Sequence, residues 1–252
     1  MKLLFPDNFY SRLIKESLPD ALNKEISFLP SALIADKTSA DPDIVGLVPT
    51  LDLIRHKDLY ISKSFGITFE SSLCNTYIYF NTHDKNINEL FIGGDVSSME
   101  VILAKILFEE VYDSSIDIKI SPDLSKLDGK NFMLVGDENF NNKNYSRGIS
   151  FAEEIADAFS IPFVNYVFAS SSDKLIKEIN KQLKNISTFI YDKIESGGFG
   201  SGLTEEQKNY IIDNFSSFIF DLTDQDMEAV NQLIQLPYLK GIVDNITEVK
   251  FV

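Results

Sequence analysis

Tryptophan is absent from the 252-residue sequence, and cysteine occurs once, as Cys74. A single cysteine excludes a disulfide within the chain. With only two histidines, His56 and His83, the chain also lacks the residues for a Cys/His zinc site. No run of eighteen apolar residues occurs, so no membrane-spanning helix is expected.

Basic residues are also scarce, with 23 Lys and Arg against 38 Asp and Glu, which gives a net charge of −15. A surface of this sign repels nucleic acid phosphates and anionic membranes. We therefore expect neither nucleic acid binding nor membrane insertion. An anionic ligand would have to be held by a local device such as a helix N-terminus.

The chain nevertheless carries ample core-forming material, with 44% hydrophobic residues, 20 Phe and 10 Tyr. This aromatic content excludes disorder over most of the chain, and the length suits one or two domains. The apolar run Leu3–Phe5 ends at Pro6 and is too short for a signal peptide. A cytoplasmic location is the resulting expectation, while the sequence holds no signal for an oligomeric state.

Two hydrophobic periods alternate along the first three quarters of the chain, which predicts an α/β fold with largely parallel sheets. The expected strands are Lys2–Phe5, Ile26–Leu29, Ile44–Leu47, Thr76–Phe80, Leu90–Ile92, Ile116–Ile120, Phe132–Val135 and Phe163–Ala169. The expected helices are Phe9–Leu18, Ser97–Tyr112, Ser150–Phe159 and Ser172–Lys184. After Ile186 the pattern predicts helices only.

Short strands suggest two small sheets and hence two lobes. We place residues 1–84 and 187–252 in lobe I, and residues 85–186 in lobe II. The polar segment Asn81–Lys85 is the expected hinge.

Ser97 and Glu100 have the spacing of a capping box at the start of a strong helix. That structural role accounts for Ser97. Ser98 and the free N–H groups of the first turn offer an alternative role, the binding of a ligand carboxylate.

Three further places carry polar groups with two open interpretations. The segment Ser71–Thr76 is either a capped turn or a set of donors at a strand entrance. Asp7 and Asn8 form a turn, yet they follow the first strand, at the sheet edge where α/β proteins bind ligands. Arg147 is either a surface residue or reaches across a cleft to an acid.

Two motifs favour plain structural roles. The cluster Gly197–Gly202 lacks the Gly-Lys-Ser/Thr ending of a phosphate loop and predicts a connector before a helix capped by Thr204 and Gln207. Cys74 has no histidine nearby in the sequence that would activate it as a nucleophile.

Six segments, in order, resemble the chorismate dehydratases of the futalosine route to menaquinone (the MqnA type). The stretch from Val45 reads VGLVPTLDLIRHKDLY and is similar to the family's "aLvPsieylrhpdLy". The matching segments are Val45–Tyr60, Phe65–Phe80, Gly94–Ser98, Met133–Asp137, Phe151–Val167 and Leu203–Val230.

The resemblance implies a two-lobed, periplasmic-binding-protein-like (type II) fold with the ligand between the lobes. It further implies a bacterial lyase that removes water from chorismate, a small anionic organic acid, to give 3-enolpyruvyl-benzoate. A carboxylate of the substrate would itself take the ring proton. No metal or organic cofactor is implied.

The same resemblance assigns a site. It gives catalytic roles to Asn8 and Asn75, and substrate-binding roles to Ser72, Thr76, Ser97 and Ser98. Arg147, if it reaches across the cleft, is a further candidate for substrate binding. The chain departs from the family in this region. Only Asn8 survives from the opening "sYLNtlP" motif, Asn75 replaces a serine, and Glu100 replaces a residue of "SSrTS".

These departures leave alternatives open. The first hypothesis is a chorismate dehydratase, and the second is a diverged two-lobed protein that binds a small carboxylate without dehydrating it. A third, an interaction protein, rests on the acidic surface alone.

Overall fold

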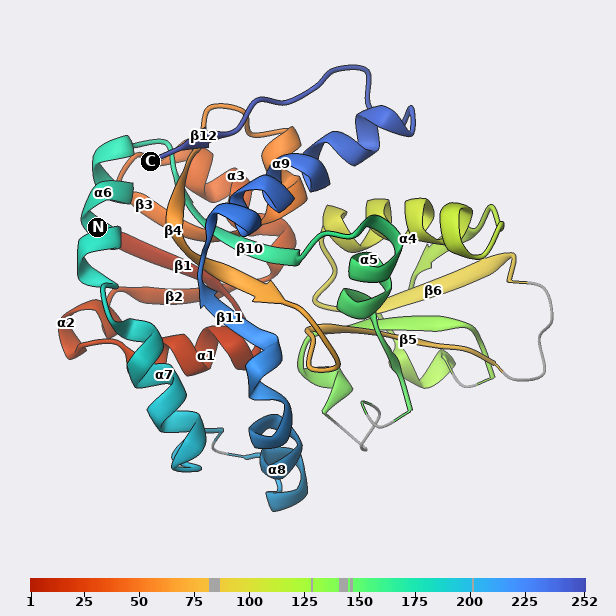
Figure 1. Cartoon of the computed structure of the whole chain (residues 1–252), viewed down its shortest axis with the longest axis horizontal. Coiled ribbons are helices and arrows are strands. Elements are labelled where there is room, and N and C mark those ends of the chain that lie inside the picture. The colour runs from red at the N-terminus through yellow and green to blue at the C-terminus, as the bar shows by residue number, and fades with distance from the viewer. Residues whose placement is uncertain (82–86, 128, 141–144, 146, 201) are drawn as a thin grey trace.

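The computed structural model describes residues 1–252 except 82–86, 128, 141–144, 146 and 201. Two β-sheets form the centres of two lobes that lie side by side, and both chain termini belong to the larger lobe (Figure 1).

The larger sheet has the strand order β11-β4-β10-β3-β1-β2, and β12 pairs with β4. β1 runs parallel to β2 and β3, whereas β10 runs antiparallel to both β3 and β4. Its strands are β1 (Lys2–Pro6), β2 (Ile26–Leu29), β3 (Ile44–Pro49), β4 (Tyr60–Phe69), β10 (Phe163–Ser170), β11 (Phe218–Asp221) and β12 (Lys250–Phe251).

The smaller sheet has the order β7-β6-β8-β5-β9. β6 runs parallel to β7 and β8, while β5 runs antiparallel to β8 and β9. Its strands are β5 (Thr76–Tyr79), β6 (Glu89–Gly94), β7 (Asp117–Ile120), β8 (Phe132–Val135) and β9 (Ile149–Ser150).

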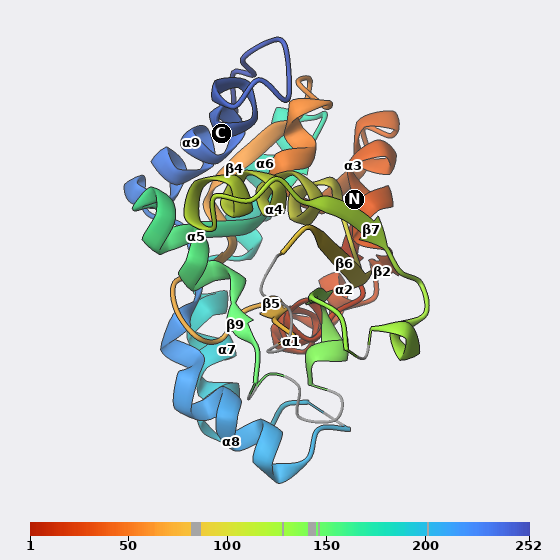
Figure 2. The same cartoon turned by 90° about the vertical axis from the view of Figure 1, so that its right-hand side faces the viewer.

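Helices cover both sheets (Figures 1 and 2). Those of the larger lobe are α1 (Phe9–Ser17), α2 (Asp20–Asn23), α3 (Ser31–Ala40), η1 (Thr50–Ile54), α6 (Asp173–Gln182), α7 (Ile186–Glu195), α8 (Glu205–Asn214), η5 (Phe215–Ser217) and α9 (Asp224–Leu239). Those of the smaller lobe are α4 (Ser98–Val111), η2 (Leu124–Lys126), η3 (Asp137–Asn139) and α5 (Phe151–Phe159).

The two-lobed α/β architecture agrees with the sequence prediction, but both sheets are mixed instead of largely parallel. In the larger sheet the reason is β10, which inserts between β3 and β4 and runs against both of them. In the smaller sheet it is β5, which runs against β8 and β9. The sequence pattern also missed β4 and α3, and β11 and β12 interrupt the region expected to be all-helical.

The strand pairing corrects the expected lobe boundaries in two places. β5 was assigned to lobe I, yet it pairs with β8 and β9 of the smaller sheet. β10 was assigned to lobe II, yet it lies at the centre of the larger sheet. The chain therefore crosses between the lobes after β4 and again before β10, not at Asn81–Lys85, a segment that lies largely outside the described residues.

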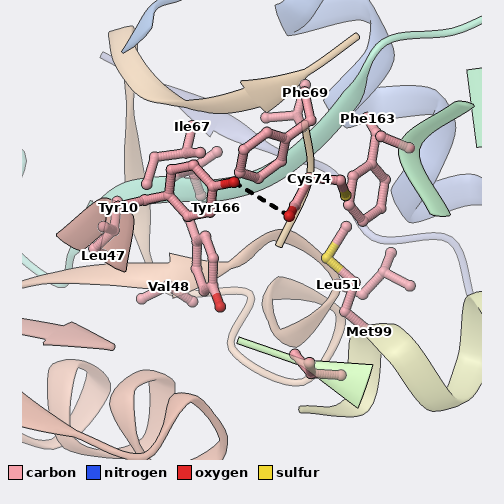
Figure 3. Close-up of a cluster of buried hydrophobic side chains, with 14 of the residues drawn as sticks. Tyr10, Leu47, Val48, Leu51, Ile67, Phe69, Cys74, Met99, Phe163 and Tyr166 are labelled. Carbon is pink, nitrogen blue, oxygen red and sulfur yellow. Dashed lines mark hydrogen bonds between the residues drawn. The ribbon is translucent and has the colours of Figure 1, made fainter. Parts of the chain in front are cut away.

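The core of the larger lobe continues up to the lobe boundary. β3 and β10 are buried along their whole lengths, which is typical of strands covered on both faces. Tyr10, Phe69 and Phe163 pack there with Leu47 and Met99, and the Tyr10 hydroxyl donates to the Cys74 carbonyl oxygen (Figure 3). This packing holds β10 and the chain segment before β5 in fixed positions at the boundary between the lobes.

Candidate functional site

The hydroxyl of Tyr166 joins the two lobes through side-chain amides. Asn8, which follows β1 in the larger lobe, places its Nδ2 3.5 Å from this oxygen. Asn75, at the entrance to β5 of the smaller lobe, donates to it from Nδ2 at 3.3 Å. All three side chains are at most 2% exposed. The two asparagines that the resemblance assigns to the site thus converge on one atom.

The same hydroxyl begins a hydrogen-bonded chain. Tyr166 accepts from the two amides, so its own proton points toward Ser31 Oγ, 3.1 Å away. Ser31 Oγ in turn donates to Asp95 Oδ2 at 2.6 Å, and the Ser31 backbone N–H donates to Asp95 Oδ1 at 2.8 Å. The chain therefore runs from the Tyr166 phenol to a carboxylate of the smaller lobe.

Three buried polar atoms beside this centre have no hydrogen-bond partner among the described residues: Asn75 Oδ1, Thr76 Oγ1 and Asn165 Oδ1. They lie where the chain enters β5 and in the bulge of β10 next to Tyr166. A buried acceptor without a donor costs about 1–3 kcal/mol. The centre can therefore form further hydrogen bonds next to the two places where the chain crosses between the lobes.

Buried carboxyl groups surround the centre. Burial raises the pKa of Glu100 to about 7, although Ser97 donates to this carboxyl from both its N–H and its hydroxyl. Burial also raises the pKa of Asp95 and, together with the charges of Glu100 and Asp95, that of Tyr166. The surroundings favour the neutral forms of Glu100 and the phenol.

Carboxylates of the smaller lobe close two helix N-termini of the larger lobe. Asp95 caps α3 through Ser31, as described above. Asp137 accepts a hydrogen bond of 2.6 Å from the Phe9 N–H at the start of α1 and forms an ion pair with Arg12. A helix N-terminus attracts negative charge. The protein's own carboxylates thus occupy places that suit an anion.

In a third contact between the lobes, the carboxylate belongs to the larger lobe and the helix N-terminus to the smaller lobe. The hydroxyl of Ser98, the first residue of α4, donates to Asp52 of η1. Asp52 is buried, and this burial raises its pKa to about 6.

Two cavities of about 220 Å³ each border both lobes. One lies between α1, η3 and the segment before α8, where Arg12 and Asp137 meet. The other lies between α3, η1 and the start of α4. Neither lining includes Asn8, Asn75 or Tyr166, so the polar centre itself is closed in this conformation.

The remaining candidate site residues do not join this centre through hydrogen bonds between described residues. Ser72 donates to Asn214 of α8 at 2.8 Å, and Ser97 forms the expected capping box with Glu100. Arg147 is exposed before β9, and Thr76 is buried without a partner among the described residues. Ser98 contacts Asp52 instead of the asparagines.

Cys74 is fully buried, and burial raises its pKa to about 12. This environment disfavours the thiolate that a nucleophile needs. Within the described residues, no group of three His, Cys, Asp or Glu side chains is placed to hold a metal ion. Among the described helices, none combines the length and the apolar character of a membrane span.

Tyr166, Ser31 and Asp95 were not predicted from the sequence. Tyr166 lies in a strand that was interpreted only as core, although an Asn-Tyr pair inside a buried strand signals a need for hydrogen-bond partners. Ser31 and Asp95 come from different lobes, and no sequence pattern indicates that they are in contact.

The Tyr166→Phe variant tests the shared hydroxyl. We expect it to lower the free energy of unfolding by about 2 kcal/mol or more, because it leaves two buried amide groups without their acceptor. Urea unfolding measures the change, with Tyr60→Phe, at a half-exposed ring, as the matched control. Equal effects of the two substitutions would contradict the role given to Tyr166.

Glu100 predicts a pH dependence of stability. Its pKa of about 7 in the folded chain exceeds the value near 4 of an unfolded glutamate, so the unfolded chain loses this proton first as pH rises. The free energy of unfolding should fall by about 2 kcal/mol between pH 5 and pH 8. Glu100→Gln should flatten this fall, and Glu109→Gln, at an exposed position of α4, should not. An unchanged slope in Glu100→Gln would contradict the assignment.

The sequence matches no protein-family model, and no curated protein matches it. Solved structures do match. AF1704 from Archaeoglobus fulgidus has 12% sequence identity and a TM-score of 0.63 over 96% of this chain and 98% of that one. The alkanesulfonate-binding protein SsuA from Xanthomonas axonopodis pv. citri, bound to MOPS, has 10% identity and a TM-score of 0.64 over 98% and 95%.

A third similar structure is the CA3427 gene product of Candida albicans, described as having the generic periplasmic binding protein fold. It has 13% identity and a TM-score of 0.60 over 97% of this chain and 91% of that one. At these identities the likeness shows the fold alone. The chain has the periplasmic-binding-protein fold, with two lobes built on mixed sheets.

Proposed function

We propose that the chain binds a small organic acid between its lobes, at the centre formed by Asn8, Asn75 and Tyr166. The observation that carries this proposal is the convergence of two amide groups, one from each lobe, on a single oxygen. Two donors held by separate lobes are suited to grip one acceptor oxygen of a ligand as the lobes close.

In the structure the Tyr166 hydroxyl supplies that acceptor oxygen. When the lobes separate, a carboxylate oxygen of the ligand takes its place against the amides. Asn75 Oδ1 has no donor among the described residues and is then free to accept from a ligand hydroxyl. The geometry therefore favours a hydroxy acid over a simple carboxylic acid.

Local attraction has to overcome the net charge of −15. The N-termini of α1 and α3 provide it, because the Phe9 and Ser31 N–H groups already hold carboxylates. Two of the structures that share this fold are named as sulfonate-binding proteins, which agrees with an anionic ligand. The cytoplasmic location expected from the N-terminal sequence stays a prediction.

Chorismate dehydratase activity is the second candidate. Asn8 and Asn75, to which the resemblance assigns catalysis, do converge. Glu100 stands where the family has an uncharged residue, but burial raises its pKa to about 7, so near neutral pH it repels a bound carboxylate less than a fully ionised glutamate would.

A dehydration would use these groups as follows. A substrate carboxylate takes the ring proton, the C–O bond breaks, and the leaving hydroxyl receives a proton from Glu100, so that water departs. The proton held by the product carboxyl group then returns to Glu100, which restores the acid. Aromatisation of the ring drives the elimination. A buried acid with a pKa of about 7 suits proton donation near neutral pH.

Ligand binding is tested by thermal unfolding with a panel of small hydroxy acids, simple carboxylic acids and sulfonates, because a ligand that binds the folded state raises the Tm. We expect hydroxy acids to give the largest rise. Asn75→Ala should weaken binding at least about tenfold, equivalent to about 1.4 kcal/mol. Asn209→Ala, at an exposed position of α8, should bind as the wild type does. No Tm rise with any acid would overturn the proposal.

Turnover is tested by incubating the protein with freshly prepared chorismate and following 3-enolpyruvyl-benzoate by NMR. We expect product above the spontaneous background, and a loss of about a hundredfold or more in Glu100→Gln if this residue is the acid. Binding of chorismate without product would reject the dehydratase and retain the binding proposal.

A further inference from the structure

The cavity between α3, η1 and the start of α4 carries charged groups of both signs. Asp36 and Asp52 line it together with Arg55 and His56, and Ser98 lies at the side of the smaller lobe. Ala32 and Ala35, on the facing side of α3, leave the space open. The polar centre at Tyr166 shares none of these residues.

Two of the charged groups form no ion pair within 4 Å among the described residues, although the charge of Arg55 does act on Asp52. His56 Nε2 lies 3.1 Å from Asp36, which accounts for one pair. Asp52 and Arg55 line the same cavity but form no ion pair, either with each other or with another residue that the structure describes. An acidic and a basic side chain thus face one space without meeting.

Asp52 has the stronger need for a partner. Its side chain is 7% exposed, and the Ser98 hydroxyl is the single donor that reaches its carboxyl group from the described residues. A buried carboxylate is costly unless it is paired and hydrogen-bonded. Burial accordingly raises its pKa to about 6, and a nearby ammonium group would reverse that change.

We propose that this cavity is a second binding site, for a small zwitterionic amino acid whose ammonium group pairs with Asp52 and whose carboxylate pairs with Arg55. The cavity volume of about 220 Å³ leaves room for a small amino acid such as glycine, alanine or serine. The bound ligand would contact both lobes, because Ser98 belongs to the smaller one.

Isothermal titration calorimetry with glycine and L-serine, and with acetate and methylammonium as singly charged controls, tests this site. We expect glycine and L-serine to bind with Kd values of about 1 mM or tighter. Acetate and methylammonium, which carry one charge each, should bind more weakly by about tenfold or more.

Matched variants locate the site. Asp52→Asn and Arg55→Gln should each weaken glycine binding at least about tenfold. Asp43→Asn and Lys57→Gln make the same charge changes at exposed positions outside the cavity and should bind as the wild type does. Circular dichroism verifies that each variant is folded, and Asn can still accept from Ser98 in Asp52→Asn.

The outcomes separate this site from the proposed organic-acid site. Asn75→Ala should leave glycine binding unchanged, whatever its effect on acids. Absence of glycine and serine binding up to about 10 mM overturns the proposal. Unchanged binding in Asp52→Asn or Arg55→Gln also overturns it, and loss in Asn75→Ala instead would place the amino acid at the polar centre.

Discussion

A single phenol oxygen, shared by amide groups from both lobes, is the interaction on which the closed arrangement depends. Tyr166 lies on β10, the strand between β3 and β4 that makes the larger sheet mixed. Asn75 precedes β5, directly after the chain leaves the larger sheet. The hydrogen bonds at this oxygen therefore tie a strand of one lobe to the entrance of the other, next to both crossings of the chain.

Carboxylate side chains form further contacts between the two lobes. Asp95 and Asp137 reach from the smaller lobe to helix starts of the larger lobe, and Asp52 reaches from the larger lobe to Ser98. Such contacts combine a helix dipole with an opposite charge, and a competing anion can replace them. The same arrangement that holds the lobes together thus supplies places for a ligand, which is how a strongly acidic protein can bind an acid.

Sequence periodicity predicted the two-lobed α/β class, eight strands and the capping boxes at Ser97 and Thr204, because local patterns determine them. The lobe boundaries and the sheet directions were wrong, since β5 and β10 exchange lobes through long-range pairing. At the site, the resemblance brought forward Asn8 and Asn75. Tyr166 escaped notice because a buried tyrosine in an apolar strand has the pattern of a core residue, and its role follows only from partners more than ninety residues away.

The mutual dependence of Asn8, Asn75 and Tyr166 has an evolutionary consequence. Loss of the phenol oxygen leaves two buried amide groups without a hydrogen-bond acceptor. Loss of either amide removes one donor to the buried oxygen, and water does not reach this region to replace it. Stepwise replacement therefore passes through less stable intermediates. Among homologues, these three positions should change together or stay as they are, and lineages that have replaced all three should also have acquired a different ligand.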